Sequence, residues 1–125
     1  MSAPTTYGDL HLDDVFLAAR RIAGLVRHTP LIESPALAKE TGAATVLCKL
    51  ESLQNTGAFK VRGASNRILS LTADERRRGV ITFSTGNHGK AVAFVAGQTG
   101  IPAVVCVSEH VPNYRVELIR SLGAE

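Results

Sequence analysis

NTGAFKVRGASN, residues 55–66, is the stretch that most constrains the fold of this 125-residue chain. It places Lys60 where a glycine-containing turn gives way to a helix, directly after the aromatic ring of Phe59. A lysine amine becomes a useful nucleophile toward an aldehyde only when its neutral form is populated, and partial burial favours that form. We therefore expect Lys60 to point into a cleft. The alternative is a solvated lysine on a helix surface.

A second polar stretch, STGNHG at residues 84–89, begins 24 residues after Lys60. It follows the apolar run at 80–83, so it lies at the carboxyl end of an expected strand, where ligands of open α/β sheets bind. The amides that begin the next helix, and the polar side chains of the stretch, are potential donors to an anion. Those side chains belong to Ser84, Thr85, Asn87 and His88. The alternative is a glycine-containing turn in which a serine or asparagine caps the helix.

The two stretches together resemble the pyridoxal-phosphate enzymes of fold type II, the tryptophan-synthase-like group. Within that group they look most like the threonine dehydratase and serine racemase branch, in which Phe-Lys-x-Arg-Gly carries the Schiff-base lysine. Here that motif is Phe59, Lys60, Arg62 and Gly63. The neighbouring words RHTPL at 27–31 and KLESLQ at 49–54 fit as well, so the resemblance covers roughly residues 13–125.

The resemblance implies pyridoxal 5′-phosphate as the cofactor and an amino acid as the substrate. It implies that Lys60 is the catalytic lysine that attaches the cofactor, that Phe59 packs near it, and that Asn87 hydrogen-bonds its phenolic oxygen. The residues implied to hold the substrate carboxylate are Ser84, Thr85, Gly86, Asn87 and His88. The implied reaction is a lyase reaction, which eliminates the β-hydroxyl of a serine- or threonine-like amino acid and gives a 2-oxo acid and ammonia.

Two alternative activities remain open. Serine racemases usually carry a second serine before Gly86, where this chain has Thr85, so an amino-acid racemase of the same fold is one of them. The other is a catalytically inert fragment, because the resemblance places the glycine-rich phosphate loop and the partner of the pyridine nitrogen further along such enzymes. The strings STGNHGKAVA at 84–93 and VCVS at 105–108 look most like the dehydratase-like proteins of hydroxyectoine utilisation.

Strands alternate with helices along the chain, which predicts an α/β fold with mainly parallel sheets and covering helices. The expected strands lie at 45–50, 80–83 and 101–107, and the first is apolar enough to be covered on both faces. The expected helices are one that ends near residue 27 and others at about 35–40, 59–71, 73–78, 90–98 and 112–122. The resemblance makes residues 1–72 the N-terminal part of a large cofactor-binding domain and residues 73–125 part of a small domain, with the remainder of the enzyme missing.

Two further residues of the first stretch have expected roles. Arg62 should orient the loop before Lys60, with its guanidinium hydrogen-bonded to backbone carbonyls or to Glu51, in preference to contacting the substrate. A solvated arginine on the helix surface is the alternative. Gly63 weakens its helix by about 1 kcal/mol relative to alanine, which suggests that another backbone or a ligand approaches it closely.

Composition narrows the range of partners. The net charge is +3, aromatic residues make up 5% and tryptophan is absent, which argues against a nucleic-acid-binding face. No segment approaches membrane-spanning length and the N-terminus has no apolar signal core, so we expect no membrane partner and a cytoplasmic location. The four histidines lack metal-ligand spacing, and Cys48 and Cys106, each in an apolar run, are expected to be buried thiols; no metal is expected. The full-length enzyme is expected to be a homo-oligomer.

Overall fold

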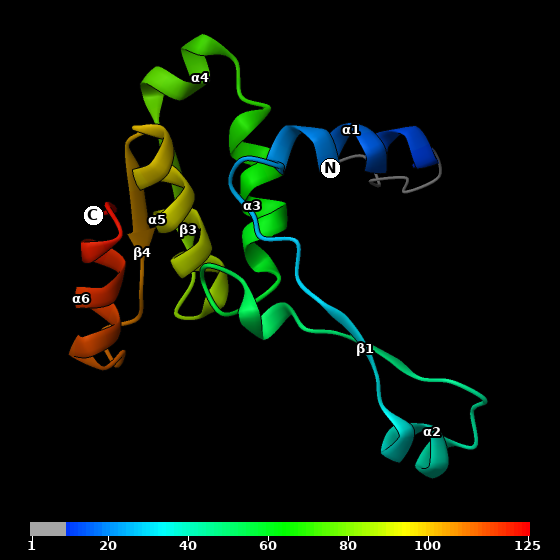
Figure 1. Cartoon of the computed structure of the whole chain (residues 1–125). Helices are drawn as coiled ribbons and strands as arrows, with labels where there is room; N and C mark the ends of the chain where they lie inside the picture. Colours follow the sequence, from blue (N-terminus) through cyan, green and yellow to red (C-terminus); the bar gives the residue numbers. More distant parts are fainter. Residues whose placement is uncertain (1–9) are drawn as a thin grey trace, which may run out of the picture.

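The computed structural model describes residues 10–125 as short strands and helices in alternation (Figure 1). The first half contains α1 (Leu12–Ile22), β1 (Leu31–Glu33), α2 (Pro35–Thr41), β2 (Leu47–Lys49) and the 3₁₀ helix η2 (Glu51–Leu53). The second half contains α3 (Lys60–Leu69), α4 (Ala73–Arg78), β3 (Val80–Phe83), α5 (Asn87–Thr99), β4 (Ala103–Cys106) and α6 (Asn113–Ser121). The predicted α/β class is confirmed.

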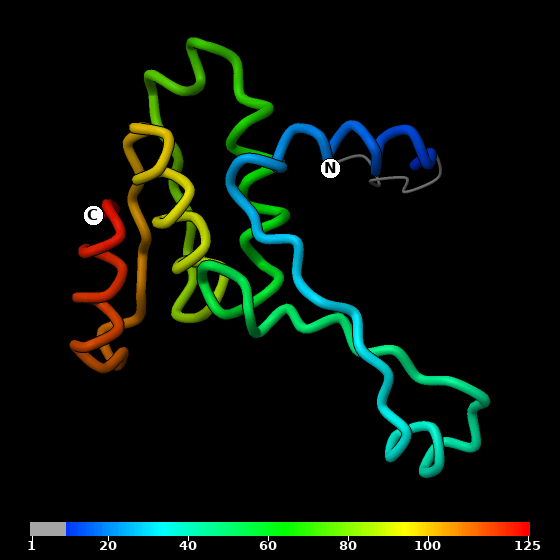
Figure 2. Tube along the Cα trace, in the orientation of Figure 1, coloured from blue at the N-terminus to red at the C-terminus, as the bar shows by residue number. Residues whose placement is uncertain are grey.

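The first sheet pairs β1 with β2 and differs from the prediction. The strands run antiparallel, with Leu31 opposite Lys49, whereas the apolar run at 45–50 was expected in a mainly parallel sheet. Residues 31–49 form an arm that projects from the other helices, with α2 at its tip (Figure 2). Because the arm stands away from the core, Leu47 remains 54% exposed. The prediction that this strand is covered on both faces is therefore wrong, and β1 is an additional strand.

The second sheet pairs β3 with β4 in parallel, with Val80 opposite Ala103, as the alternating pattern predicts. Along β4, Ala103 and Val105 are buried while Val104 and Cys106 are exposed. Successive side chains of a strand point to opposite faces, so residues 10–125 cover only one face of this sheet. The Cys106 thiol lies on the uncovered face, and the prediction that it is buried is wrong. Cys48, on β2, is partly buried.

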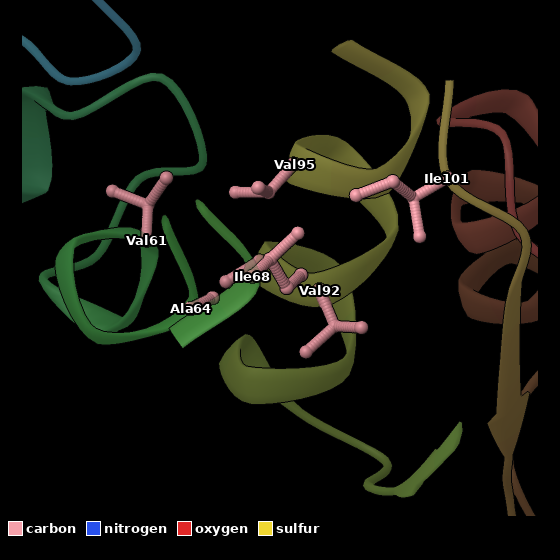
Figure 3. Close-up of a cluster of buried hydrophobic side chains, with 7 residues drawn as sticks. Val61, Ala64, Ile68, Val92, Val95 and Ile101 are labelled. Atoms are coloured by element: carbon pink, nitrogen blue, oxygen red, sulfur yellow. The ribbon is translucent and has the colours of Figure 1, made fainter. Parts of the chain in front are cut away.

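α5 is the central element of the core because it is buried on two sides. One cluster joins it to α3 (Figure 3); its buried members are Val61, Ala64, Ile68, Ala91, Val92, Val95 and Ile101. A second cluster joins it to β4 and α6; its buried members are Ala93, Ala96, Ala103, Val105, Ile119 and Ala124. The same core therefore supports the start of α3, where Lys60 lies, and the start of α5, where the second polar stretch ends.

Most predicted helices form close to their expected bounds, but α1 ends at Ile22 and not near residue 27, because residues 23–25 form turns. A second difference affects the site. α4 spans the predicted residues 73–78, and its amino end is closed by Thr72: the Glu75 amide donates to the Thr72 hydroxyl, and the Thr72 amide donates to the Glu75 carboxylate. α5 begins at Asn87 rather than near residue 90. The second polar stretch is therefore a three-residue loop, 84–86, followed by the first turn of a helix.

Candidate active site

Lys60 is the first residue of α3 and follows Phe59, the N-cap residue. Its amine nitrogen lies 4.9 Å from the centre of the Phe59 ring, within range of a cation–π contact. Both side chains are exposed, because α3 buries a different face. The residues on that buried face are Val61, Ala64, Ser65 and Ile68. The prediction that the amine of Lys60 is partly buried is therefore wrong for the chain described here.

A cavity of about 780 Å³ lies beside Lys60, between α3, α4 and β3. Phe59, Lys60 and Gly63 line it from the start of α3, and His88 lines it from the first turn of α5. A Cβ placed on Gly63 would meet no other heavy atom within 4 Å. The close approach that this glycine suggested is therefore not made by any described residue, and the space beside it is open.

The loop at 84–86 is held by its backbone and by a glycine in the next turn. The Ser84 amide donates to the carbonyl of Cys106 at 3.0 Å, and the Gly86 amide donates to the Ser84 hydroxyl at 3.3 Å. A Cβ on Gly89 would lie 2.7 Å from the Ser84 carbonyl oxygen and 2.9 Å from Cγ1 of Val105. Only glycine fits there, because any side chain would push the loop off the sheet.

Four of the five residues predicted to hold the substrate carboxylate divide between two cavities. His88 lines the cavity of Lys60, whereas Thr85, Gly86 and Asn87 line a smaller one of about 230 Å³ between the loop and α6. Ser84 lines neither cavity. The structure therefore brings Phe59, Lys60 and His88 together and places Thr85, Gly86 and Asn87 at the other cavity.

Two residues beside this loop were missed by sequence reasoning. Tyr114 and Arg115 of α6 line the smaller cavity, and Nη1 of Arg115 donates to the Thr85 carbonyl oxygen at 3.2 Å. Arg115 also donates through Nε to the Tyr114 hydroxyl oxygen at 3.1 Å. They lie some 30 residues beyond the loop, and no motif in the sequence connects them to it.

Arg62 has the partners that the sequence predicts. Its Nε donates to Oε2 of Glu51 at 2.9 Å and its Nη2 donates to Oε1 at 2.7 Å. The pKa of Glu51 is lowered from 4.5 to about 2, chiefly by these hydrogen bonds from Arg62. Burial raises this pKa, whereas the Thr29 hydroxyl and the charges of Arg62 and Lys49 lower it further. The pKa of Arg62 is raised, chiefly by the bond to Glu51. Glu51 is therefore an anion at neutral pH.

The chemistry of these groups suits a carbonyl compound and an anion. The amine of Lys60 can react with an aldehyde. The N-cap residue of α5, Gly86, contributes no side-chain cap, so the first amides of this helix are donors for a negative group. Within residues 10–125 no cluster of three or more His, Cys, Asp and Glu side chains is arranged as metal ligands. In the same range no helix has the length and apolar character needed to cross a membrane.

Fold and site together define an α/β protein with a lysine amine at a cleft and a helix amino end beside it. The family described as pyridoxal-phosphate dependent enzyme matches residues 22–125. A Sinorhizobium fredii relative, provisionally named a threonine dehydratase, is 47% identical over 116 residues. The L-threonine ammonia-lyase of Thermotoga maritima is 41% identical over 114 residues. The serine racemase of Dictyostelium discoideum has a structure that matches with a TM-score of 0.86 at 35% identity.

These matches cover most of this chain and a smaller part of each relative. They span 93% of this chain and 35% of the S. fredii protein, and 91% of this chain and 28% of the T. maritima enzyme. For the D. discoideum structure the shares are 92% and 37%. The chain thus spans about a third of the length of its relatives. It belongs to the pyridoxal-phosphate-dependent enzymes, and its fold is the predicted fold type II.

Proposed function

We propose that the full-length gene product containing this chain is a pyridoxal-phosphate-dependent lyase. It would remove the β-hydroxyl of a serine- or threonine-like amino acid and release a 2-oxo acid and ammonia. The observation that carries the proposal is the shared cavity, in which Lys60 from the first polar stretch and His88 from the second line one cleft. Family membership and the likeness to an L-threonine ammonia-lyase support the reaction class.

Bound at this site, the cofactor would supply an electron sink for the negative charge that develops on the substrate Cα. Nζ of Lys60 would hold the cofactor covalently until the substrate amine displaces it, and the freed amine would then move the proton from the substrate Cα. Phe59, whose ring lies beside the amine, would pack against the cofactor and limit the access of water. The Asn87 side chain, which lines the smaller cavity in this structure, would have to turn toward Lys60 to donate a hydrogen bond to the phenolic oxygen of the cofactor.

The substrate carboxylate would be held at the amino end of α5. A helix amino end favours a negative group through its dipole and its unpaired amides. The residues proposed to contact the carboxylate are Ser84, Thr85, Gly86, Asn87 and His88. Because His88 lines the cavity of Lys60 while Thr85, Gly86 and Asn87 line the smaller one, the carboxylate would lie across the helix end, with His88 on the side of Lys60.

Lys60→Ala is expected to abolish covalent attachment of the cofactor. The measurement is borohydride reduction of the full-length gene product loaded with pyridoxal phosphate, followed by peptide mapping. The reduced cofactor should appear on the peptide that contains Lys60 and should be lost in the variant. Lys39→Ala, on the arm, is a matched control that should retain the label. A reduced cofactor on any other lysine would contradict the proposal.

Thr85 is expected to favour elimination over racemisation. It retains a hydroxyl, but its β-branched side chain has restricted rotation, so the hydroxyl is poorly suited to return a proton to the opposite face of Cα. With L-serine in deuterated water, pyruvate should form faster than α-deuterated D-serine, and Thr85→Ser should shift the ratio toward D-serine. D-serine outpacing pyruvate in the unsubstituted protein would favour the alternative reading, a racemase.

The 125-residue chain by itself is proposed to be inert. The resemblance places the phosphate loop and the partner of the pyridine nitrogen outside this chain, so its affinity for the cofactor should be poor. The visible spectrum of the chain mixed with pyridoxal phosphate is the direct measurement. A stable protein-bound absorption band with pyruvate formation from L-serine would contradict this proposal.

We infer the remaining properties of the whole protein from the resemblance and from composition. Residues 1–72 would belong to a large domain and residues 73–125 to a small one, and the cluster between α3 and α5 would lie across that boundary. The two free thiols, Cys48 and Cys106, support a reducing, cytoplasmic location. A homo-oligomer is expected, without nucleic-acid or membrane partners.

A further inference from the structure

The lysine loop, residues 51–59, is bonded to the segment at 25–29 mainly through side chains. Nε2 of Gln54 donates to the Arg27 carbonyl at 2.7 Å, and the Arg27 amide donates to Oε1 of Gln54 at 3.1 Å. Nδ2 of Asn55 donates to the Leu25 carbonyl at 2.9 Å. Gln54 is 4% exposed, so its two bonds are shielded from water, whereas the bond of Asn55 is exposed. The position of the loop therefore depends on the identity of a few polar residues.

Glu51 is the residue at which three segments meet. Besides its two bonds from Arg62, its Oε1 accepts a hydrogen bond from the Thr29 hydroxyl at 2.5 Å. Thr29 is 1% exposed, and its carbonyl accepts a bond from Nζ of Lys49 at 2.6 Å. A two-pronged arginine–carboxylate pair fixes orientation as well as distance. One carboxylate thus joins segment 25–29, the lysine loop and α3.

Arg62 joins this network to the start of α3, two residues after Lys60. The N-cap residue Phe59 makes no side-chain cap, and the first turn contains no acidic residue. Capping side chains normally satisfy and orient the amino end of a helix. Here Arg62 holds the first turn through Glu51 and through a bond from its Nη2 to the Arg27 carbonyl at 3.3 Å. The direction in which the Lys60 side chain leaves the helix depends on that turn.

We propose that Glu51 and Arg62 are positioning residues that hold the amine of Lys60 at the cleft in the pose from which it attaches the cofactor. This inference rests on the proposed function of Lys60. The competing explanation is that Glu51 and Arg62 form an ion pair that only stabilises the fold. That explanation would suit a pair on the surface better than this one, which is partly buried. The side chains of Arg62 and Glu51 are 33% and 17% exposed, against 63% and 68% for the pair of Arg120 and Glu117.

The test measures how fast the cofactor attaches to Lys60 in the apo form of the full-length gene product. Glu51→Gln keeps the shape and removes the charge, whereas Arg62→Lys keeps the charge and loses the planar fork. Glu117→Gln makes the same substitution in an exposed arginine–glutamate pair and is the matched control. Attachment is followed by absorbance over a range of pyridoxal phosphate concentrations and confirmed by borohydride trapping, and circular dichroism reports the folded fraction under the same conditions.

The expected result is a change in rate without a matching change in folding. Because misplacing a reacting group by about 1 Å can cost about 100-fold, each variant should lower the limiting attachment rate by about 10- to 100-fold. The half-saturating cofactor concentration should change little. The double variant should be no slower than the slower single variant, since the two residues act as a unit. Glu117→Gln should attach the cofactor at the unchanged rate.

Either of two results would overturn the positioning role: an unchanged attachment rate in both variants, or a rate that falls only in proportion to the folded fraction. If neither variant folds, Thr29→Val and Thr29→Ser decide, because valine keeps the shape and loses the hydroxyl donor to Glu51. Slow attachment in the valine variant alone supports positioning, and equal rates contradict it. Label on a lysine other than Lys60 would instead contradict the proposed function.

Discussion

The two loops beside the cleft are held in place by different kinds of interaction. The lysine loop, residues 51–59, is positioned by side chains, above all the charged pair of Glu51 with Arg62 and the amide of Gln54. The loop at 84–86 is positioned by its backbone, which bonds to β4, and by its close approach to Gly89. The position of the first loop therefore depends on side-chain charge and hydrogen bonds. The position of the second depends on backbone hydrogen bonds and on the absence of a side chain at Gly89.

This difference fits the tasks proposed for the two loops. A single reacting atom, Nζ of Lys60, must be held in one place, and directional bonds achieve that. A carboxylate needs several donors around it. The loop is tied to β4 through its backbone, and the Ser84 hydroxyl, which accepts a bond from the Gly86 amide, can still donate its own proton. We therefore expect the loops to respond to different substitutions, and the predictions below run from the largest effect to the smallest.

Protonation of Glu51 at low pH should produce the largest effect on stability. It should weaken the bonds that hold the lysine loop and leave the loop at 84–86 unchanged. The pKa of Glu51 is lowered from 4.5 to about 2, so its contribution to folding is complete above pH 4.5 and is lost as the pH falls toward 2. At about 1.36 kcal/mol per pKa unit the contribution is at most about 3 kcal/mol, and less because solvent reaches Arg62. The difference in urea-unfolding free energy between the full-length gene product and its Glu51→Gln variant should shrink over this range.

The comparison between these two proteins isolates Glu51 from other acidic groups. The pKa of Glu75 is also lowered, by bonds from the amide and hydroxyl of Thr72, but Glu75 is present in both proteins and its effect cancels. A difference in unfolding free energy that stays constant between pH 4.5 and pH 2 would show that the Glu51 charge does not stabilise the lysine loop.

Added volume at Gly89 should affect the other loop. In Gly89→Ala the new methyl group would lie 2.7 Å from the Ser84 carbonyl oxygen, a backbone atom that can move only with the loop. Overpacking of this kind costs about 1–3 kcal/mol, measured as a lower urea-unfolding free energy. Gly63→Ala is the matched control: it lies in a helix with open space beside it and should be neutral or stabilising by up to about 1 kcal/mol. Equal losses in the two variants would contradict the role of volume.

Local signals in the sequence were sufficient to predict much of the fold. The bounds of α4 follow from a threonine cap at residue 72 and a glycine at 79, and β3 follows from four apolar or β-branched residues between two polar turns. The pairing of Arg62 with Glu51 was also predictable, because the two residues are only 11 positions apart in the sequence and carry opposite charges.

Features that depend on distant packing could not be predicted. The exposure of Lys60 is decided by which face of α3 meets α5, and the exposure of Cys106 by the absence of a covering layer among the described residues. The antiparallel pairing of β1 with β2 follows from the way the arm turns back at α2. Neither the division of the carboxylate residues between two cavities nor the bond from Arg115 to Thr85 has a local sequence signal.

Loss of Arg115 should have the smallest effect, and it should fall on substrate binding alone. The guanidinium makes one exposed hydrogen bond to the loop, at 3.2 Å, and such a bond contributes about 0.5–1.5 kcal/mol. Arg115→Ala should therefore raise the KM for L-serine or L-threonine by about 2- to 10-fold while kcat changes little.

Cofactor attachment separates this effect from that of Arg62. If the two loops are held independently, Arg115→Ala leaves the rate of attachment to Lys60 unchanged, whereas Arg62→Lys lowers it. Tyr114→Phe is the control for the arginine, because it removes the hydroxyl that accepts a bond from Nε of Arg115 and keeps the bond to the loop. An Arg115→Ala variant that attaches the cofactor slowly would mean that the two loops are coupled through α5, against the separation argued here.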